Sequence, residues 1–238
     1  MKTAALLAFL GMTTIGHAQS IVLTTEDYPP YNFREGSELR GVGYDQVVAF
    51  MDAMGEKYSV EMMPWARAIA LAETEPMHCV FTTAHIPERE GRFKWVEPLA
   101  VDRNVMIAKR NSGVAVKNVE EARQYTVGTQ RDDYTQALLE RDGFPKIDLA
   151  TDLNLTLKKL LSGRIDLMPI SEKYYYELRE AGNPVEVQFI LSEQKFALAC
   201  NLAFPDDLLA RMQAGLDRLI KDGTQDALFK KYGMVANQ

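Results

Sequence analysis

The feature of this sequence that most restricts its fold is the alternation of short strand-like segments with helix-like segments of about ten residues. The first strand-like run is Ile21-Val22-Leu23, and an amphipathic stretch at residues 44–54 follows it. Strands separated by helices predict parallel βαβ units with helices on both faces of a sheet. Two such groups are present, at residues 21–108 and 114–190, and a return segment follows them.

The limits of the elements follow from local signals. Gly55, Gly163 and Gly223 end helix-like stretches, and Ser171 is the predicted N-cap of another. The predicted helices are 44–54, 65–72, 132–141, one through 153–161, 172–181, a long one through 208–220, and 224–231. The predicted strands after the first are 59–62, 79–83, 105–108, 126–128, 165–168, 185–189 and 196–200.

The loops that follow the strands are where we expect a ligand. Open α/β sheets bind ligands beyond the carboxyl ends of their strands. If two lobes face each other across a cleft, five of these loops converge there. They are the loops that follow Leu23, Met62, Phe81, Gly128 and Met168.

The N-terminus has the three parts of a secretory signal peptide. Lys2 supplies the positive charge, residues 4–12 are almost entirely apolar, and Gly16-His17-Ala18 places small residues around a cleavage site. The apolar run is too short to span a membrane, and a buried N-terminal helix is the alternative reading. We expect cleavage after Ala18 and a periplasmic location, with no lipid anchor because the first residue after the cleavage site is Gln19 and not cysteine.

The charge balance excludes some classes of partner. The chain has 27 Lys and Arg against 33 Asp and Glu, which gives a formal charge of −6. An acidic protein is poorly suited to binding nucleic acid or an anionic membrane surface. We therefore expect a small-molecule partner and no nucleic-acid partner.

The only two cysteines, Cys79 and Cys200, lie in apolar strand-like runs. An oxidising compartment permits one bridge between them. Their separation along the chain says nothing about contact, so the residues themselves favour two buried thiols.

No motif of a common enzyme class is present. The sequence lacks a Walker loop, a dinucleotide-binding glycine motif, a nucleophile elbow and the spacings of a zinc site. We therefore predict no metal, no cofactor and no catalytic residue.

The loops do carry side chains suited to binding a ligand, because Trp65 and Arg67 open a helix and Arg89 follows a strand. Arginine can grip a carboxylate through two parallel hydrogen bonds.

A series of short motifs resembles the family 3 extracellular solute-binding proteins of bacteria, which are best known for uptake of polar amino acids through ABC transporters. The resemblance extends from about Ile21 to Gly233. Its motifs, in order, are Tyr28-Pro29-Pro30-Tyr31-Asn32-Phe33, Gly41-Val42-Gly43-Tyr44-Asp45, Ile86-Pro87-Glu88-Arg89, Phe93-Lys94-Trp95-Val96-Glu97-Pro98, Tyr125-Thr126-Val127-Gly128-Thr129-Gln130, Gly163-Arg164-Ile165-Asp166, Lys221-Asp222-Gly223-Thr224 and Lys230-Lys231-Tyr232-Gly233.

The resemblance implies an α/β, two-lobed fold of the type II periplasmic-binding-protein kind. Each lobe is a mostly parallel sheet flanked by helices, and two hinge strands join the lobes near residues 105–109 and 195–198. Lobe 1 is then residues 19–107 with 197–238, and lobe 2 is residues 108–196. The return strand enters lobe 1 beside its third strand, which brings contact between the two cysteines within reach. The expected protein is a monomer that presents its solute to ABC-transporter membrane subunits or to a membrane sensor.

The resemblance also implies a ligand site. Arg89 falls at the family's carboxylate-binding arginine, Tyr28 and Trp65 at its aromatic walls, and Thr82 at a polar contact position. Ala84 has lost the hydroxyl of a second such position. The full predicted ligand set is Tyr28, Trp65, Arg67, Thr82, Thr83, Arg89, Thr129, Arg131, Asp133, Ser171 and Glu172.

Because of two departures from the family pattern, the sequence does not determine the chemical class of the solute. Asp132-Asp133 replaces the usual Gly-Ser or Gly-Thr of an anion-binding turn, which favours a cation or a polyhydroxy group. Ser171, with Glu172 beside it, replaces the aspartate that receives the solute's amino group, whereas Arg67 and Arg131 suit a more anionic solute. The alternative function is that of a cyclohexadienyl dehydratase, with Glu172 or Asp133 as general acid.

Overall fold

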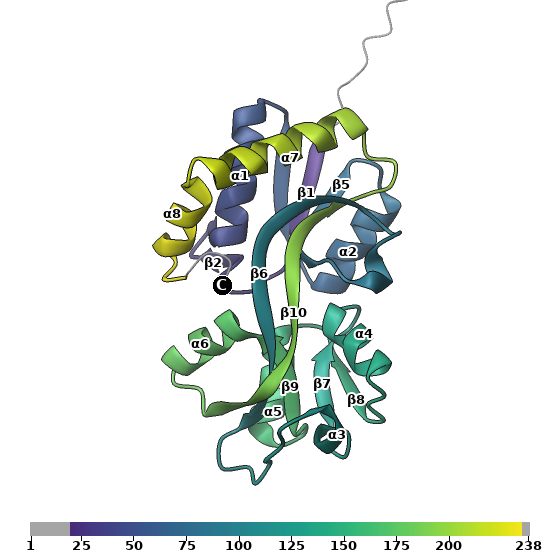
Figure 1. Cartoon of the computed structure of the whole chain (residues 1–238), viewed down its shortest axis with the longest axis vertical. Helices are drawn as coiled ribbons and strands as arrows, with labels where there is room; N and C mark the ends of the chain where they lie inside the picture. The colour runs from purple at the N-terminus through teal and green to yellow at the C-terminus, as the bar shows by residue number, and fades with distance from the viewer. Residues whose placement is uncertain (1–19, 235–238) are drawn as a thin grey trace, which may run out of the picture.

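The computed structural model describes residues 20–234, so the predicted signal peptide at residues 1–18 lies outside the described residues. The chain forms two lobes, one above the other, and two long strands run through both of them (Figure 1). These strands, β6 (Lys94–Lys109) and β10 (Val185–Cys200), join the lobes into one eight-stranded sheet. The strand order of this sheet is β4-β1-β5-β10-β6-β9-β7-β8.

Lobe 1, the upper lobe in Figure 1, is built on three parallel strands in which β1 lies between β4 and β5. Alternate residues of β5 point to opposite faces of the sheet. Phe81 packs with α1 and α7, whereas Val80 packs with α2 on the other face. The elements of lobe 1 are β1 (Ile21–Thr25), β2 (Phe33–Glu35), β3 (Glu38–Arg40), α1 (Val42–Met54), β4 (Tyr58–Met62), α2 (Trp65–Thr74), β5 (His78–Ala84), the 3₁₀ turn η1 (Pro87–Arg89), α7 (Asp206–Lys221) and α8 (Thr224–Lys231).

Lobe 2 repeats this plan with β7 between β8 and β9, again in parallel. Leu167 of β9 packs with α4, and its neighbour Met168 packs with α5 and α6 on the other face. The elements are α3 (Val119–Ala122), β7 (Val127–Gln130), α4 (Tyr134–Arg141), β8 (Ile147–Ala150), α5 (Leu153–Ser162), β9 (Leu167–Ser171) and α6 (Glu172–Glu180). The predicted two-lobed α/β class is therefore confirmed, and the lobe limits given above stay a prediction.

The crossing between the lobes lies in the middle of β6 and β10. β6 pairs with β9 of lobe 2 from Asn104 to Ala108, and β10 pairs with β5 of lobe 1 from Phe196 onward. Residues 101–103 and 193–195, which lie between these two stretches, pair with each other in the β6–β10 ladder. The predicted hinge at 105–109 thus lies within the part of β6 that pairs with β9, and the crossing comes a few residues earlier.

Cys79 and Cys200 are directly opposite each other in the β5–β10 pair and form a disulfide, with an S–S distance of 2.03 Å. The expectation of two buried thiols is wrong. It failed because the pairing of β10 with β5 is a long-range feature that the two apolar runs do not reveal by themselves. The bridge cross-links residues 121 positions apart, and lobe 2 is inserted between them.

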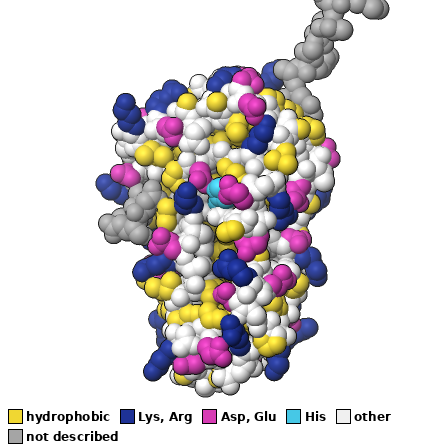
Figure 2. Space-filling view, turned by 45° about the vertical axis from the view of Figure 1, so that its right-hand side comes forward, with side chains coloured by type: hydrophobic (Ala, Val, Ile, Leu, Met, Phe, Trp, Pro, Cys, Tyr) yellow, Lys and Arg dark blue, Asp and Glu magenta, His cyan; other side chains and the backbone are white. Residues whose placement is uncertain are grey.

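Acidic and basic side chains are interspersed over the face of both lobes that Figure 2 displays. The large apolar side chains that are most exposed, such as Ile190 and Leu202, are 53% and 55% accessible to solvent. Among the described residues, no helix is long and apolar enough to cross a membrane.

Candidate functional site

The loops after the parallel strands of both lobes meet where the lobes face each other. Glu26 directly follows β1, Trp65 opens α2 after β4, and Arg89 ends the turn η1 after β5. From lobe 2, Gln130 ends β7 and Asp133 is the N-cap of α4. This confirms the predicted convergence of the strand ends at the interface between the lobes.

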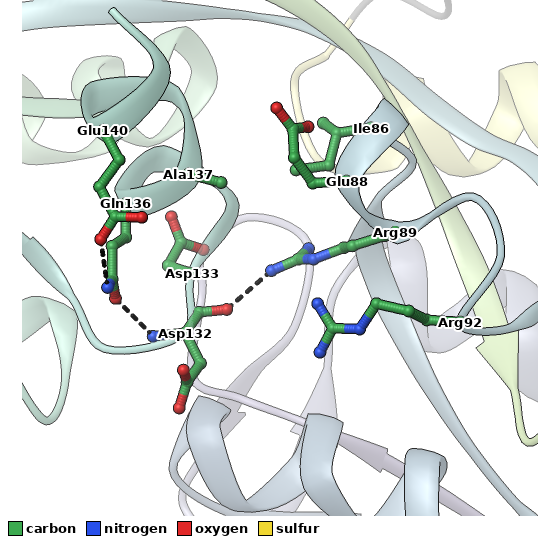
Figure 3. A pocket seen from close by; sticks show the side chains of 9 residues that line it. All are labelled: Ile86, Glu88, Arg89, Arg92, Asp132, Asp133, Gln136, Ala137 and Glu140. Carbon is green, nitrogen blue, oxygen red and sulfur yellow. Dashed lines mark hydrogen bonds between the residues drawn. The ribbon is translucent and has the colours of Figure 1, made fainter. Parts of the chain in front are cut away.

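Arg89 lies at the centre of this interface and is only 2% exposed. Its Nη2 donates to the carbonyl oxygen of Asp132 in lobe 2 at 2.7 Å, and its Nη1 donates to the carbonyl of Ala84 at 3.3 Å. The guanidinium carbon lies 5.3 Å from the centroid of the Trp65 ring. Burial lowers the pKa of Arg89 to about 10, and the carboxylate of Asp133 acts against this fall. The guanidinium is therefore a buried donor aimed at the opposite lobe (Figure 3).

The carbonyl of Asp132 receives two donors from lobe 1. Besides Arg89, the indole Nε1 of Trp65 donates to it at 2.8 Å. Asp132 has a positive φ of 60°, a left-handed conformation in which aspartate is more common than most residues. Its amide donates to Oε1 of Gln136 at 2.9 Å, which fixes the turn to the first turn of α4. The turn thus directs a main-chain oxygen, rather than a side chain, at lobe 1.

Two carboxylates lie close to Arg89. Glu26 is 7% exposed, and its Oε2 accepts from Nε2 of Gln130 at 2.7 Å. Burial raises the pKa of Glu26 to about 8, and the negative charge of Asp133 contributes to the rise. Asp133 is partly buried and accepts from the amide of Thr135 at 2.9 Å as a helix cap. Burial also raises the pKa of Asp133, although Arg89 opposes the shift.

Aromatic side chains fill the hinge side of the interface. The ring of Phe196 on β10 lies 5.1 to 6.4 Å, centroid to centroid, from Tyr28, Tyr31 and Tyr134. Tyr174 contacts Tyr28 edge-on at 5.5 Å. Burial raises the pKa of the Tyr28, Tyr31 and Tyr134 hydroxyls well above the usual range, so these hydroxyls stay neutral.

Three of these hydroxyls join the lobes to the crossing strands. Tyr31 donates to Oδ2 of Asp102 at 2.7 Å, and the hydroxyl of Ser171 donates to the same oxygen. Tyr28 accepts from the amide of Ser171 at 3.0 Å. Tyr134 accepts from Asn104 at 2.7 Å, and also from Gln194 on β10. Hydrogen bonds thus link lobe 1, lobe 2 and both crossing strands.

Two cavities open between the lobes. The first has a volume of about 180 Å³ and is the one drawn in Figure 3. Its lining is Ile86, Glu88, Arg89, Arg92, Asp132, Asp133, Gln136, Ala137 and Glu140. The second has a volume of about 140 Å³. Its lining is Glu26, Asp27, Met62, Met63, Pro64, Asp152, Leu153 and Asn154. Both cavities have walls from both lobes.

The structure brings five of the predicted ligand residues to the interface: Tyr28, Trp65, Arg89, Asp133 and Ser171. Two others, Arg67 and Arg131, are exposed to solvent. Glu172 is bound by Arg103, whose Nη2 lies 2.6 Å from its Oε2.

The three predicted threonines are buried and bonded to their own lobes. Thr82 donates to Oδ1 of Asn32 at 3.0 Å and has a φ of 60°. It is the extra residue at the shift in register between β5 and β10, a bulge of the kind that often borders a binding site. Thr83 donates to the carbonyl of Val80, and Thr129 bonds the hydroxyl of Thr135.

The prediction omitted several residues that the structure places at the interface: Glu26, Tyr31, Asp102, Gln130 and Tyr134. Glu26 and Gln130 had a usable signal, since each comes at the carboxyl end of a strand. Among residues 20–234, no three His, Cys, Asp or Glu side chains are grouped so that they could hold a metal ion.

Comparisons with known proteins bear on the whole chain. The sequence profile described as "Bacterial extracellular solute-binding proteins, family 3" matches residues 21–235. The probable amino-acid-binding protein YxeM of Bacillus subtilis (strain 168) is 23% identical over 252 aligned positions, which cover 98% of this chain and 93% of that protein. The probable histidine-binding protein of Campylobacter jejuni subsp. jejuni (serotype O:2) is 23% identical, with 88% and 82% covered.

A solved structure has the same fold. It is a histidine kinase sensor domain with similarity to periplasmic binding proteins, and it superposes with a TM-score of 0.84. The two sequences are 21% identical, and the match covers 92% of this chain and 98% of that one. At this level of identity the similarity establishes the fold and does not identify the ligand.

Proposed function

The chain belongs to family 3 of the bacterial extracellular solute-binding proteins, and from this premise we propose that it captures a small polar solute between its lobes. The solute is an amino acid or a related molecule that carries a carboxylate and an amine. Closure of the lobes buries the solute and creates a surface that a membrane partner can recognise.

The observation that carries this proposal is the position of Arg89. A buried guanidinium needs an anionic or strongly polar partner, and the hydrogen-bond acceptors that residues 20–234 offer to Arg89 are two main-chain carbonyls. A carboxylate that enters between the lobes replaces the carbonyl of Asp132 with a charged, bidentate partner. Charge-assisted hydrogen bonds are about twice as strong as neutral ones, so this exchange favours the bound state.

The other interface residues complete the binding site. Trp65, whose ring centroid lies 5.3 Å from the guanidinium carbon, and the buried Tyr28 are the aromatic walls of the proposed site. Asp133 receives the ammonium group, since it lines the same cavity as Arg89. The hydroxyl of Ser171 already donates to Asp102 and caps α6, so its role as a ligand contact also remains a prediction. The predicted roles of Thr82, Thr83, Thr129, Arg67, Arg131 and Glu172 as ligand contacts remain predictions.

The membrane partner is either the membrane subunits of an ABC importer or a membrane sensor. The relatives named as amino-acid-binding proteins and the sensor domain support one alternative each. A periplasmic location is supported by the family and by the Cys79–Cys200 disulfide, since such bonds persist in oxidising compartments. We expect the protein to act there as a monomer.

The test is binding of amino acids, amines and dicarboxylates to the chain that begins at Gln19. A solute that binds only the folded protein raises its melting temperature, and titration calorimetry then gives the affinity. Arg89→Ala should weaken binding by roughly 30-fold or more, because loss of one partner of a buried charge pair costs about 2–5 kcal/mol. Arg89→Lys should recover only part of the loss, because lysine lacks the planar fork.

Arg211→Ala is the matched control, because Arg211 is exposed and pairs with Glu56 on the surface. It should bind like the wild type. Unchanged affinity in both Arg89 variants would remove this residue from the site. If no amine, amino acid or carboxylate raises the melting temperature, the proposed function is wrong.

A second candidate function is that of a cyclohexadienyl dehydratase. The observation in its favour is that burial raises the pKa of the interface carboxyls, Glu26 to about 8, as a general acid requires. The general acid in this candidate function is Asp133 or Glu172, as the sequence suggested, and Glu172 is bound by Arg103. Incubation with prephenate or arogenate, followed by detection of the aromatic product, separates the two functions.

A further inference from the structure

One main-chain oxygen of lobe 2 accepts from two donors of lobe 1 at the centre of the interface. The guanidinium of Arg89 donates to the carbonyl of Asp132 at 2.7 Å (Figure 3), and the indole of Trp65 donates to the same oxygen at 2.8 Å. Arg89 and Trp65 are each 2% exposed. An oxygen of a solute carboxylate would accept from the same two N–H groups. The carbonyl therefore uses the donors that the proposed function assigns to the solute.

The turn at residues 131–133, which carries this carbonyl, is anchored within lobe 2. The amide of Arg131 donates to the carbonyl of Ala150 at 3.0 Å, and the amide of Asp132 donates to Oε1 of Gln136 at 2.9 Å. A group that is already held in place loses little freedom when it accepts a hydrogen bond. Because it belongs to the same chain, its effective concentration at the donors is also high. The carbonyl is therefore a strong competitor for Arg89.

The turn also limits the space beside Arg89. Asp132 and Arg89 both line the first cavity, whose volume is about 180 Å³. Sites for small molecules are usually larger, about 300–1,000 Å³. Withdrawal of the turn from Arg89 therefore frees both the donors and the room that a solute with a carboxylate and an ammonium needs.

Further hydrogen bonds within the chain stabilise the closed arrangement of the lobes. Gln130 of lobe 2 donates to Glu26 of lobe 1 at 2.7 Å, and the amide of Ser171 donates to the hydroxyl of Tyr28 at 3.0 Å. Together with the two bonds to the carbonyl of Asp132, they connect the lobes directly. The closed form thus has a stabilisation of its own, to which the turn contributes two donors' worth of hydrogen bonding.

We propose that the turn at residues 131–133 is an internal competitor of the solute. In the closed form its main-chain carbonyl occupies Arg89 and Trp65, and a solute carboxylate binds after the turn has withdrawn from them. This inference rests on the proposed function and specifies how that site is regulated. The apparent affinity for the solute is lowered in proportion to the fraction of molecules that are in the self-bonded form.

The test uses two substitutions of Asp132 that differ in the backbone conformation they allow. Asp132 is exposed and has a φ of 60°. Asp132→Gly and Asp132→Ala both remove its carboxylate, but glycine adopts this φ freely and alanine is disfavoured there. The ratio of self-bonded to open molecules should therefore be at least roughly fivefold lower in Asp132→Ala than in Asp132→Gly.

Two measurements in the absence of solute report this ratio. Small-angle X-ray scattering follows the separation of the lobes, and fluorescence emission follows the burial of Trp65. The sequence has one other tryptophan, so all samples carry Trp95→Phe. Asp132→Gly should have the radius of gyration of the closed form, whereas Asp132→Ala should shift towards a larger radius and a longer emission wavelength. Separated lobes in Asp132→Gly would overturn the inference, because the carbonyl then does not hold the lobes together.

The binding measurement uses the protein amino acids as probes. The amino acid that most raises the melting temperature of the wild type is titrated into each variant by calorimetry. Asp132→Ala should bind it at least roughly fivefold more tightly than Asp132→Gly, because fewer of its molecules are self-bonded. Asn111→Gly and Asn111→Ala are the matched controls, since Asn111 is exposed, has a φ of 62° and lies outside both cavities. These two should bind equally.

The outcomes separate this inference from the proposed function. Equal binding by Asp132→Ala and Asp132→Gly, or weaker binding by Asp132→Ala, overturns the inference while the proposed function stands. If none of the amino acids raises the melting temperature, the proposed function and this inference fail together.

Discussion

The two lobes meet in one site, but they contribute to it by different means. Glu26 and Arg89 of lobe 1 lie outside helices, directly after a strand and in a short turn, and no helix depends on their side chains. Asp133 and Ser171 of lobe 2 are helix N-caps whose side chains accept from the backbone of α4 and α6. The site side chains of lobe 2 are held in place because they also cap helices. Those of lobe 1 have no such structural role, so they can be changed to alter the charge and specificity of the site.

The lobes also differ in how they are held together. The disulfide ties β5 to β10 inside lobe 1, and lobe 2 lies wholly within the loop that it closes. Because the sequence has only two cysteines, lobe 2 has no bridge of its own. Lobe 1 is thus the half that carries the covalent cross-link, and the two strands cross to lobe 2 at residues 101–103 and 193–195.

The largest effect that we predict concerns this disulfide. The Cys79→Ala/Cys200→Ala double variant should lose about 4–5 kcal/mol of stability, because the bridge restricts a loop of more than 100 residues in the unfolded chain. For a chain of this size that corresponds to a fall of roughly 8–20 °C in the melting temperature. Calorimetry of oxidised, reduced and variant protein measures it.

The contrast between the lobes makes this prediction sharper. Amide hydrogen exchange should show the loss of protection first in β5 and the lobe 1 half of β10, with β7 and β9 less affected. A melting temperature within about 2 °C of the oxidised wild type would contradict the predicted stabilisation, and an equal loss of protection in both lobes would mean that the bridge does not distinguish them.

Much of the fold could be predicted because the local signals agree with the final packing. Gly55 and Gly163 end α1 and α5 in the left-handed conformation, and Ser171 caps α6 as expected. The position of Arg89 at the interface between the lobes also followed from the sequence, since it comes after a strand of an α/β sheet; its carboxylate-binding role came from the family resemblance and stays a prediction.

The remainder depended on contacts that local patterns do not encode. β10 was predicted as two strands, because the polar segment around Glu193 interrupts its apolar pattern, yet this segment only crosses between lobes and needs no buried face. Asp102 was missed because its partners Tyr31 and Ser171 come from different lobes, and a local sequence pattern does not show such contacts. Glu26 was missed although its place after β1 gave a signal.

The next largest effect is the pH dependence that Glu26 brings to lobe 1. Burial raises the pKa of Glu26 to about 8, with Asp133, Asp27, Gln130 and Arg89 facing it. The folded protein therefore holds this proton more tightly than the unfolded chain does. The resulting stability is fully present below about pH 4.5 and is lost as the pH rises to about 8.

Glu26→Gln removes this titration. Its melting temperature relative to the wild type should therefore rise between pH 5 and pH 8, on the order of 5 °C. Asp133→Asn tests the lobe 2 carboxylate, whose pKa burial also raises, and asparagine preserves the helix cap. Thermal melts of the three proteins across this range show which lobe carries the pH dependence. A constant difference between wild type and Glu26→Gln would contradict the assignment of the proton to Glu26.

The smallest predicted effect tests whether lobe 2 contributes more than fixed positions. Glu172, which the sequence placed in the ligand site, is bound by Arg103, and their side chains are 13% and 44% exposed. An ion pair with one half-exposed partner is partly screened by salt and contributes little. Glu172→Gln should therefore change solute affinity by less than about threefold, and the change should shrink further at high salt. Titration calorimetry at two ionic strengths measures both. A loss of tenfold or more with an unchanged melting temperature would return Glu172 to the binding site and would show that lobe 2 also determines which solute is bound.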